Sequence, residues 1–260
     1  MVLGAGFGGL ELCTLLSEAL GDSIEVTLID KNDHFVFGFS KLDIMFGHAK
    51  PQTARLAYAN FAKSGVKLIQ QTITKIEPVA KRVTTNAGSY TADYLVVALG
   101  ADYDWDATRG LAEVNEFYTR AGAERLRDAL SHFTHGHALI GVCGAPYKCP
   151  PAPSECALML HDYLERKGVR DACKISFVLP LPSPVPPSPE TSQALIAAFA
   201  ERNIKFHPSK CVIAIDPPRR IASPRRRVRD RVRSVPWRAQ TPRTECSAPQ
   251  WLGRERVDNR

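Results

Sequence analysis

The chain has 260 residues, of which 44% are hydrophobic and 23% charged, as in ordinary globular proteins, and this composition excludes a fibrous or wholly disordered protein. Its net charge of +7 comes from the end of the chain: residues 217–260 hold 13 Arg and 4 acids, which leaves 21 bases and 23 acids in residues 1–216. The body of the protein is therefore faintly acidic, and we expect no nucleic-acid partner.

The first part of the chain predicts a strand–helix–strand unit. Residues 2–3 end a strand, the turn GAGFGG occupies residues 4–9, and apolar residues at helical spacing follow up to Leu20. Residues 24–29 form the next predicted strand, which ends at Asp30. Two strands joined in this way are expected to pair in parallel, with a right-handed crossover.

Shorter elements follow this unit. Strands are expected at residues 66–69 and 73–76, and a hairpin at residues 83–91. Residues 94–98 are a continuous apolar run, Tyr-Leu-Val-Val-Ala, which is typical of a strand buried on both faces. We therefore expect both faces of this strand to be covered.

A second unit of alternating helices and strands begins near residue 109. In chain order it comprises a helix around Leu126, a strand at 138–142, a loop at 143–153, a helix through Leu160, a strand at 175–179, a helix starting at Pro189 and a strand at 210–215. The predicted fold class is α/β: a Rossmann-type nucleotide-binding domain at residues 1–108, a second Rossmann-like unit at 109–222, and a disordered basic tail at 223–260.

The predicted tail, rich in Arg and Pro, has no apolar periodicity. The basic residues change abruptly from mixed Lys and Arg to Arg alone. Two explanations stay open: an out-of-frame translation of a GC-rich gene, or a natural disordered basic tail.

The glycine-rich turn carries the first chemical signal. Gly4 permits a tight turn, Gly6 lets the backbone approach a pyrophosphate, and Gly9 lets helix and strand pack closely. Asp30 lies at the end of the second strand, where a carboxylate can accept hydrogen bonds from a ribose. This combination predicts a dinucleotide site; a turn kept only for packing is the alternative.

The second signal is the loop GVCGAPYKCPPAPSE at residues 141–155, where a second nucleotide-binding turn would lie. Its prolines stiffen what should be a phosphate cradle, and no acid follows the strand at 175–179. Cys149 precedes a helix N-terminus and follows Lys148, and both are expected to favour its thiolate. We expect Cys149 to be reactive, and no metal site, because the cysteine and histidine spacings complete none.

Four stretches together resemble a known family: GAGFGGLE with Asp30, HFVFGFSKLDIMFG, YLVVALGA and PYKCPPAPSECALMLHDYL. They are similar to the FAD-dependent pyridine nucleotide-disulfide oxidoreductase superfamily. Within it they resemble the sulfide:quinone oxidoreductases and the flavocytochrome c sulfide dehydrogenase flavoproteins. The resemblance covers residues 1–222, and the cysteine–proline loop is its most particular part.

The resemblance implies that the dinucleotide is FAD and that residues 1–108 are the N-terminal part of its domain. The matching positions at the pyrophosphate, the ribose, the adenine and the turn beside the cofactor are, in that order, Gly4, Gly6, Phe7 and Gly9, then Asp30, then Ile73, then Ala98 and Gly100. Cys149 matches a redox cysteine whose thiolate takes up sulfur from sulfide. Electrons then pass through the flavin to a quinone, so the implied partners are a sulfide or thiol donor and a quinone acceptor.

Departures from the family pattern lead to further expectations. The first strand is short, and the family's last third, with its partner cysteine and membrane-facing helices, is absent. An unpaired sheet region and exposed apolar surface should result. The N-terminus has no signal peptide, which favours a cytoplasmic chain, with peripheral membrane contact in the full-length family. The alternatives are a type II NADH dehydrogenase-like flavoprotein and a non-enzymatic fragment with a basic interaction tail.

Overall fold

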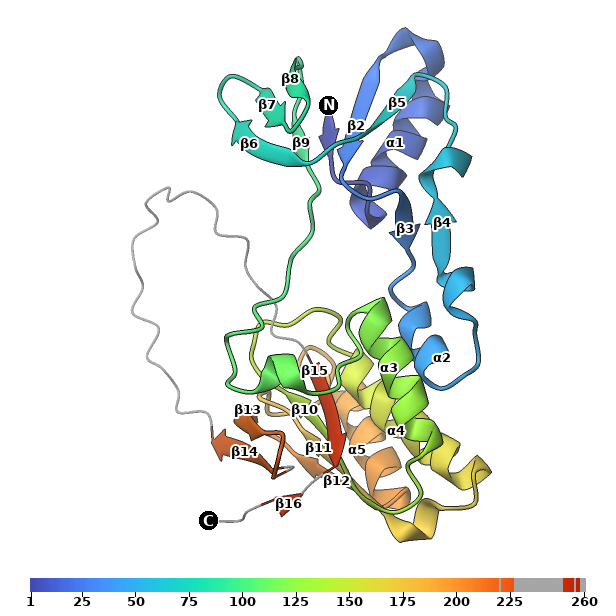
Figure 1. Cartoon of the computed structure of the whole chain (residues 1–260), viewed down its shortest axis with the longest axis vertical. Coiled ribbons are helices and arrows are strands. Elements are labelled where there is room, and N and C mark those ends of the chain that lie inside the picture. Colours follow the sequence, from blue (N-terminus) through green and yellow to red (C-terminus); the bar gives the residue numbers. More distant parts are fainter. Residues whose placement is uncertain (220, 227–249, 255, 258–260) are drawn as a thin grey trace. The chain divides into compact units, whose positions relative to one another are not determined.

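The computed structural model describes residues 1–219, 221–226, 250–254 and 256–257. The chain folds into two compact units (Figure 1). The first comprises residues Met1–Gly38 and Gln52–Gly100, and the second comprises Phe39–Pro51 and Ala101–Arg260. The segment Phe39–Pro51 therefore belongs with the second unit, although it interrupts the first in sequence.

The first unit is built on a parallel sheet of four short strands. In the order β5-β2-β1-β9 these are β5 (Val66–Gln70), β2 (Val26–Asp30), β1 (Val2–Leu3) and β9 (Val96–Val97). Helix α1 (Phe7–Leu20) joins β1 to β2, as predicted. Its buried Cys13 packs with Val2 and Leu28 in one apolar cluster.

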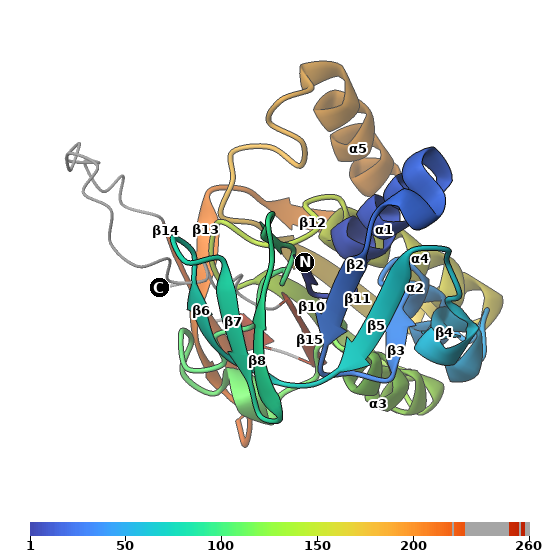
Figure 2. The ribbon, with the colours of Figure 1, turned by 90° about the horizontal axis from the view of Figure 1, so that it is seen from above.

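A three-stranded antiparallel sheet belongs to the same unit. It is formed by β6 (Ile73–Glu77), β7 (Arg82–Thr85) and β8 (Gly88–Thr91), and Figure 2 shows it apart from α1. Val83 of this sheet packs with Leu3 and Ile29, whose neighbours Val2 and Leu28 pack with α1. Successive residues of a strand point to opposite faces, so α1 and the β6–β8 sheet cover different faces of the parallel sheet.

Strand β9 differs from its prediction. It is the edge strand of the described sheet and pairs only with β1. Val97 is 58% exposed and Tyr94 82%, so the prediction that residues 94–98 are buried on both faces is wrong. A continuous apolar run does not distinguish a covered strand from one at an open edge. The exposed edge agrees with the expectation of exposed apolar surface.

The remaining ordered pieces are short. Strands β3 (His34–Val36) and β4 (Arg55–Ala57) pair in the first unit, and helix α2 (Ser40–Met45) lies in the second. Single 3₁₀ turns are found at Gly21–Ser23, Pro51–Ala54, Tyr58–Asn60, Leu111–Glu113 and Arg170–Ala172.

The second unit contains another parallel sheet, and this confirms the predicted α/β class. Its parallel strands are β10 (Gly136–Val142), β11 (Cys173–Val178) and β12 (Ile204–His207). The associated helices are α3 (Arg120–Ser131), α4 (Ala152–Arg166) and α5 (Pro189–Glu201). Ser188 caps α5 by accepting from the N–H of Thr191, as its predicted N-cap position implies.

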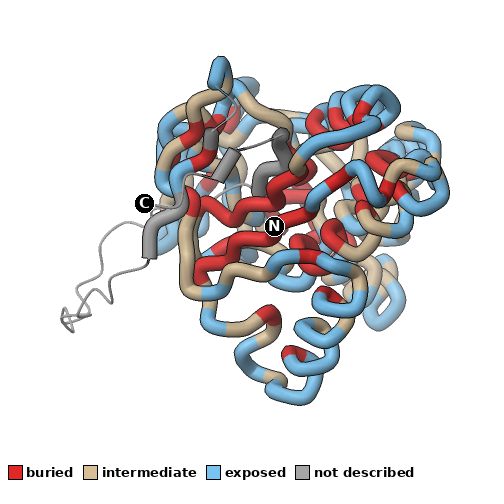
Figure 3. Tube along the Cα trace, turned by 90° about the horizontal axis from the view of Figure 1, so that it is seen from below, coloured by how far each residue is buried: buried red, intermediate tan, exposed pale blue. Residues whose placement is uncertain are grey.

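Strands β13 (Lys210–Asp216) and β14 (Ile221–Arg226) form an antiparallel pair that covers one face of this sheet. Their Val212 and Ile215 pack with Leu139 and Val178 of the parallel strands. Buried positions, red in Figure 3, are accordingly frequent along β10 and β11.

Part of the predicted disordered tail is described as strand. Besides the end of β14, these parts are β15 (Gln250–Arg254), antiparallel to β10, and β16 (Arg256–Val257), parallel to β14. The sequence did not predict them, because these residues lack apolar periodicity. Residues 227–249, 255 and 258–260 of the tail lie outside the described residues.

Glu116, a buried carboxylate, organises the start of α3. It accepts from the N–H groups of Tyr118 and Thr119, and the Thr119 hydroxyl donates to it at 2.5 Å. The same hydroxyl oxygen accepts from the N–H of Gly122 and caps the helix. A Cβ on Gly122 would lie 1.9 Å from the Glu116 carboxylate, so this position requires glycine.

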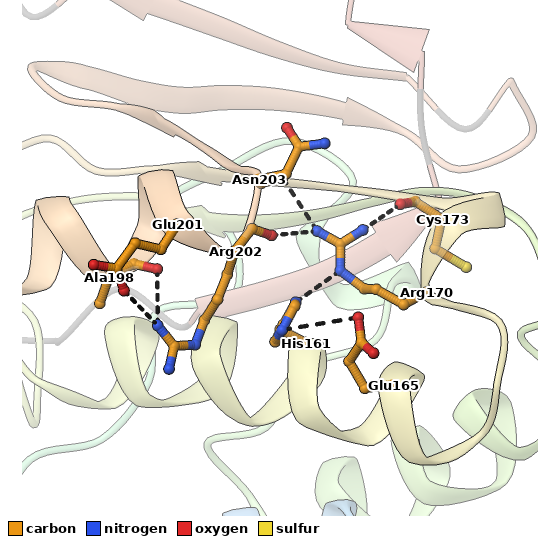
Figure 4. A network of polar contacts seen from close by, with 8 residues as sticks. All are labelled: His161, Glu165, Arg170, Cys173, Ala198, Glu201, Arg202 and Asn203. Carbon is orange, nitrogen blue, oxygen red and sulfur yellow. Dashed lines mark hydrogen bonds and ion pairs between the residues drawn. The ribbon is translucent and has the colours of Figure 1, made fainter.

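Arg170 joins α4, β11 and the end of α5 (Figure 4). Its guanidinium, 8% exposed, donates to the carbonyls of Cys173, Arg202 and Asn203. Its Nε donates to His161 Nδ1 at 2.8 Å, so that nitrogen must be unprotonated. Burial and the neighbouring Arg170 lower the pKa of His161.

This contact predicts a pH dependence of stability. Below about pH 6.5 the unfolded chain protonates His161 while the folded chain resists, so the free energy of unfolding should fall as the pH is lowered. His161→Asn keeps an acceptor but does not titrate, and should show a smaller loss between about pH 8 and about pH 5 in urea unfolding. His135→Asn, at an exposed position, is the control and should keep the wild-type slope. Equal slopes for wild type and His161→Asn would contradict the prediction.

Candidate functional site

The glycine-rich turn of the first unit depends on two close backbone contacts. Gly4 has φ +94°, and a Cβ on it would lie 2.5 Å from the carbonyl oxygen of Ala98. A Cβ on Gly9 would lie 1.9 Å from the carbonyl oxygen of Gly4. These two glycines are thus required by the fold itself, as the motif predicts.

Gly6 differs from both. No described atom lies within 4 Å of the position its Cβ would take, so packing within the protein does not explain the glycine. Gly6 is also the N-cap of α1, and it has no side chain with which to cap the first turn of the helix. Open space at a helix N-terminus fits a pyrophosphate.

Asp30 is tied to the glycine turn. One carboxylate oxygen accepts from the N–H of Ala5 at 2.7 Å, and the other accepts from the backbone and side chain of Asn32 at 2.8 Å. The carbonyl of Ala5 accepts from the buried Tyr58 hydroxyl at 2.7 Å. A carboxylate has about four acceptor positions, so holding the turn is compatible with accepting from a ribose.

The other expected cofactor positions lie differently. The N–H of Ala98 donates to Leu3, which places Ala98 against Gly4. Gly100, with φ +71°, ends the first unit. Ile73 begins β6 and packs in the cluster of Leu3, on the face of the sheet away from α1. The structure therefore gathers the glycines, Asp30 and Ala98 around one turn, while Ile73 lies in the core of the β6–β8 side.

Aromatic rings lie beside this turn. Phe7, 52% exposed, meets Phe35 edge-on at 4.8 Å and Phe37 at 5.7 Å between ring centroids. Sequence reasoning picked Phe7 but missed its two partners. Their alternate spacing on the segment after Asp30 was the available signal.

Cys149 lies in the second unit, in the loop between β10 and α4. It is half-buried and reduced, with φ +51°. The N–H of Ala152 donates to its carbonyl at 3.0 Å and closes the turn into α4. The helix N-terminus expected beside Cys149 is therefore present.

The expected cation beside Cys149 is not the one found. Lys148 donates from Nζ to the carbonyl of Ala101 at 2.5 Å and lies over the Tyr103 ring at 4.6 Å. The cation that acts on Cys149 is Lys41 of α2, whose ammonium donates to the carbonyl of Tyr118. Sequence reasoning missed Lys41 because it lies in a distant segment.

The pKa of Cys149 is raised, so the expected preference for the thiolate is contradicted. Burial is the largest cause, and the negative charge of Glu155 adds to it. The N–H of Ala152 and the ammonium of Lys41 act in the opposite direction but do not prevail. Burial also raises the pKa of Glu155, with Asp43 contributing, and lowers that of Lys41.

Three tyrosines surround this loop. The Tyr118 hydroxyl donates to the carbonyl of Lys148, and the Tyr103 hydroxyl donates to the carbonyl of Tyr118 at 3.2 Å. Tyr147 is 8% exposed, and its hydroxyl has no hydrogen-bond partner within the described part of the chain. Burial, with the charge of Cys149, raises the pKa of Tyr147 to about 12, so this hydroxyl stays protonated.

Most of the other cysteines in the described part of the chain are buried and so less accessible to a substrate. Cys13, Cys173, Cys143 and Cys156 are buried, and burial raises the pKa of Cys143 to about 12. Cys211 is half-buried. Within the described ranges, no group of three or more His, Cys, Asp and Glu side chains could hold a metal ion. No described helix combines the length and apolar content needed to cross a bilayer.

Comparison with known proteins extends this description. The family profile described as pyridine nucleotide-disulphide oxidoreductase matches residues 1–225. The mitochondrial sulfide:quinone oxidoreductase of Mus musculus is 24% identical over 184 residues, which cover 68% of this chain and 41% of that protein. A type II NADH:quinone oxidoreductase of Staphylococcus aureus is 36% identical over 102 residues, covering 38% of this chain and 25% of that protein.

Solved structures agree in fold. The crystal structure of the sulfide:quinone oxidoreductase from the hyperthermophilic bacterium Aquifex aeolicus has a TM-score of 0.74 at 26% identity and covers 83% of this chain. This chain spans 52% of the Aquifex chain and 41% of the mouse protein, so it corresponds to about half of these relatives. With a family profile matched over most of its length, the chain belongs to the pyridine nucleotide-disulphide oxidoreductase family.

Proposed function

We propose that the chain acts in an FAD-dependent oxidoreductase of the sulfide:quinone type, in which Cys149 receives sulfur from sulfide or a thiol and a quinone accepts the electrons. The observation that carries this proposal is the loop around Cys149. A half-buried thiol lies there between Lys41, Glu155 and Tyr147, where the fold would otherwise offer a second phosphate-binding turn.

The glycine turn of the first unit fits the FAD of this proposal. Gly6 leaves room for the pyrophosphate, Asp30 holds the turn and keeps acceptor positions for the ribose, and Ala98 adjoins the turn. The adenine position at Ile73 and the role of Gly100 rest on the family resemblance. When bound, FAD supplies an acceptor for a pair of electrons.

The residues around Cys149 would manage the proton and the charge. The Cys149 thiol must lose its proton before its sulfur bonds to another, and the raised pKa of Glu155 makes that carboxylate a suitable acceptor. Lys41 and the N–H of Ala152 then stabilise the thiolate. Joining this thiolate to hydrosulfide forms a persulfide, releases one proton and two electrons, and so requires the electron acceptor named above.

A second candidate is an NADH-oxidising flavoprotein. This candidate is supported by the 36% identity to the type II NADH:quinone oxidoreductase of Staphylococcus aureus, which extends over 102 residues. The second unit counts against it. Only Gly141, near the end of β10, and Gly144, in the loop after it, remain of a glycine-rich turn, and α4 follows Pro151. After β11, Pro180 follows Leu179 where an acid would hold a ribose.

FAD binding tests the role of the glycine turn. The purified chain should bind about one FAD, detected by visible absorbance, and Gly6→Val should weaken binding by about tenfold or more, because the side chain fills the open space at the pyrophosphate. Gly88→Val, at another open glycine, is the matched control. Bleaching by sulfide but not by NADH is the expected result, and bleaching by NADH alone would support the second candidate. A chain that binds no FAD would favour the non-enzymatic alternative.

The second prediction concerns the reactivity of Cys149. Its raised pKa means that alkylation by iodoacetamide should still accelerate as the pH rises through about 9. Lys41→Met removes a stabilising cation, so it should raise the pKa further and slow alkylation at a given pH. Glu155→Gln removes a negative charge and should shift the profile the other way.

The control for this measurement is Lys174→Met, at an exposed position on β11, which should leave the profile unchanged. Peptide mapping assigns the label to Cys149. A Lys41→Met profile identical to wild type would show that this cation does not act on the thiol.

A further inference from the structure

The hydroxyl of Tyr147 is one of two buried hydroxyls without a hydrogen-bond partner among the described residues. It is shielded from solvent in a side chain that is 8% exposed, and no described residue accepts its hydrogen or donates to it. Leaving a buried hydroxyl unpaired is unfavourable, so such groups commonly mark a ligand or a functional contact. The other unpaired buried hydroxyl among the described residues is that of Ser154, on the first turn of α4.

The neighbouring tyrosines show that this is particular to Tyr147. The Tyr118 hydroxyl donates a hydrogen bond to the carbonyl of Lys148, and the Tyr103 hydroxyl donates one to the carbonyl of Tyr118. Both bonds hold the loop. Tyr147 directly precedes the anchored Lys148, yet its hydroxyl contributes to neither bond.

Tyr147 is held beside Cys149 by a rigid loop. Only Lys148 separates the two residues, its carbonyl is fixed by Tyr118 and its ammonium by Ala101. Cys149 has φ +51°, and its carbonyl accepts a hydrogen bond from the N–H of Ala152, the first residue of α4. Burial raises the pKa of Tyr147 and the charge of Cys149 adds to it, in agreement with the closeness of the two residues in the loop.

The hydrogen-bond donors around Cys149 already have acceptors. The Lys41 ammonium already donates to the carbonyl of Tyr118, and the N–H of Ala152 already serves the turn. Glu155 brings a negative charge and no donor when ionised. A second sulfur atom bonded to Sγ would lie beyond the groups that stabilise Sγ. It would therefore need a hydrogen-bond donor of its own.

We propose that the Tyr147 hydroxyl donates a hydrogen bond to the terminal sulfur of a persulfide on Cys149 and is thereby a binding residue of that site. The inference rests on the proposed function, since it specifies how the sulfur intermediate is held. The terminal sulfur of a persulfide carries the negative charge. A neutral hydroxyl can donate a hydrogen bond to this sulfur and keep its own proton.

The persulfide can be formed without FAD. A polysulfide anion transfers one sulfur to the Cys149 thiolate: the Sγ–S bond forms, an S–S bond of the polysulfide breaks, and the shortened polysulfide leaves with the electron pair. Atoms and charge balance with no external oxidant. Binding at Tyr147 is therefore measurable apart from flavin reduction.

The experiment treats the full chain with inorganic polysulfide and follows the Cys149 peptide by mass spectrometry for the gain and loss of one sulfur atom. Tyr147→Phe should lower the yield or lifetime of this persulfide about tenfold, the effect of losing one hydrogen bond to a charged group. Tyr163→Phe, on α4, is the control and should behave as wild type.

Thermal stability separates binding from a structural role. Tyr147→Phe removes an unpaired hydroxyl, so the thermal midpoint should stay level or rise, whereas Tyr103→Phe loses a hydrogen bond and should lower it. An unchanged persulfide in Tyr147→Phe, a loss that only follows unfolding, or no sulfur uptake by wild-type Cys149 would overturn the inference. If sulfide fails to bleach FAD but the Tyr147 effect is present, the proposed function fails and the binding role stands.

Discussion

The hydrogen bonds of Tyr118 are the constraint on which the Cys149 loop depends. Its N–H donates to the buried Glu116, its carbonyl accepts from Lys41 and Tyr103, and its hydroxyl donates to the carbonyl of Lys148. One residue therefore joins the start of α3, the cation from α2 and the backbone beside the thiol. This arrangement, together with the N–H of Ala152 on the carbonyl of Cys149, fixes the backbone around the thiol.

The two candidate sites show different balances of fold and function. In the nucleotide turn, Gly4 and Gly9 are explained by close packing alone, and only the open space at Gly6 points to a ligand. In the cysteine loop, burial opposes the thiolate, while Lys41 and the start of α4 favour it. Burial prevails, so this thiol loses its proton less readily than an exposed cysteine does.

Much of this could be predicted from the sequence because the signals were local. The strand, glycine turn, helix and strand of the first unit follow one another directly, as do Ser188 and Pro189 at α5, and these predictions are confirmed. Nonlocal contacts could not be predicted in the same way. The cation at Cys149 comes from α2, and the exposure of β9 depends on what covers a sheet edge, which a run of apolar letters does not state.

The path of the chain between the units has a consequence for dissecting the protein. The chain passes from one unit to the other after Gly38, Pro51 and Gly100, so the structural halves are not the two halves of the sequence. Residues 101–260 expressed alone would contain Cys149, Tyr147 and Tyr118 but would leave Lys41 behind. Domain boundaries drawn on the linear sequence would thus divide the chemistry of one site between two pieces.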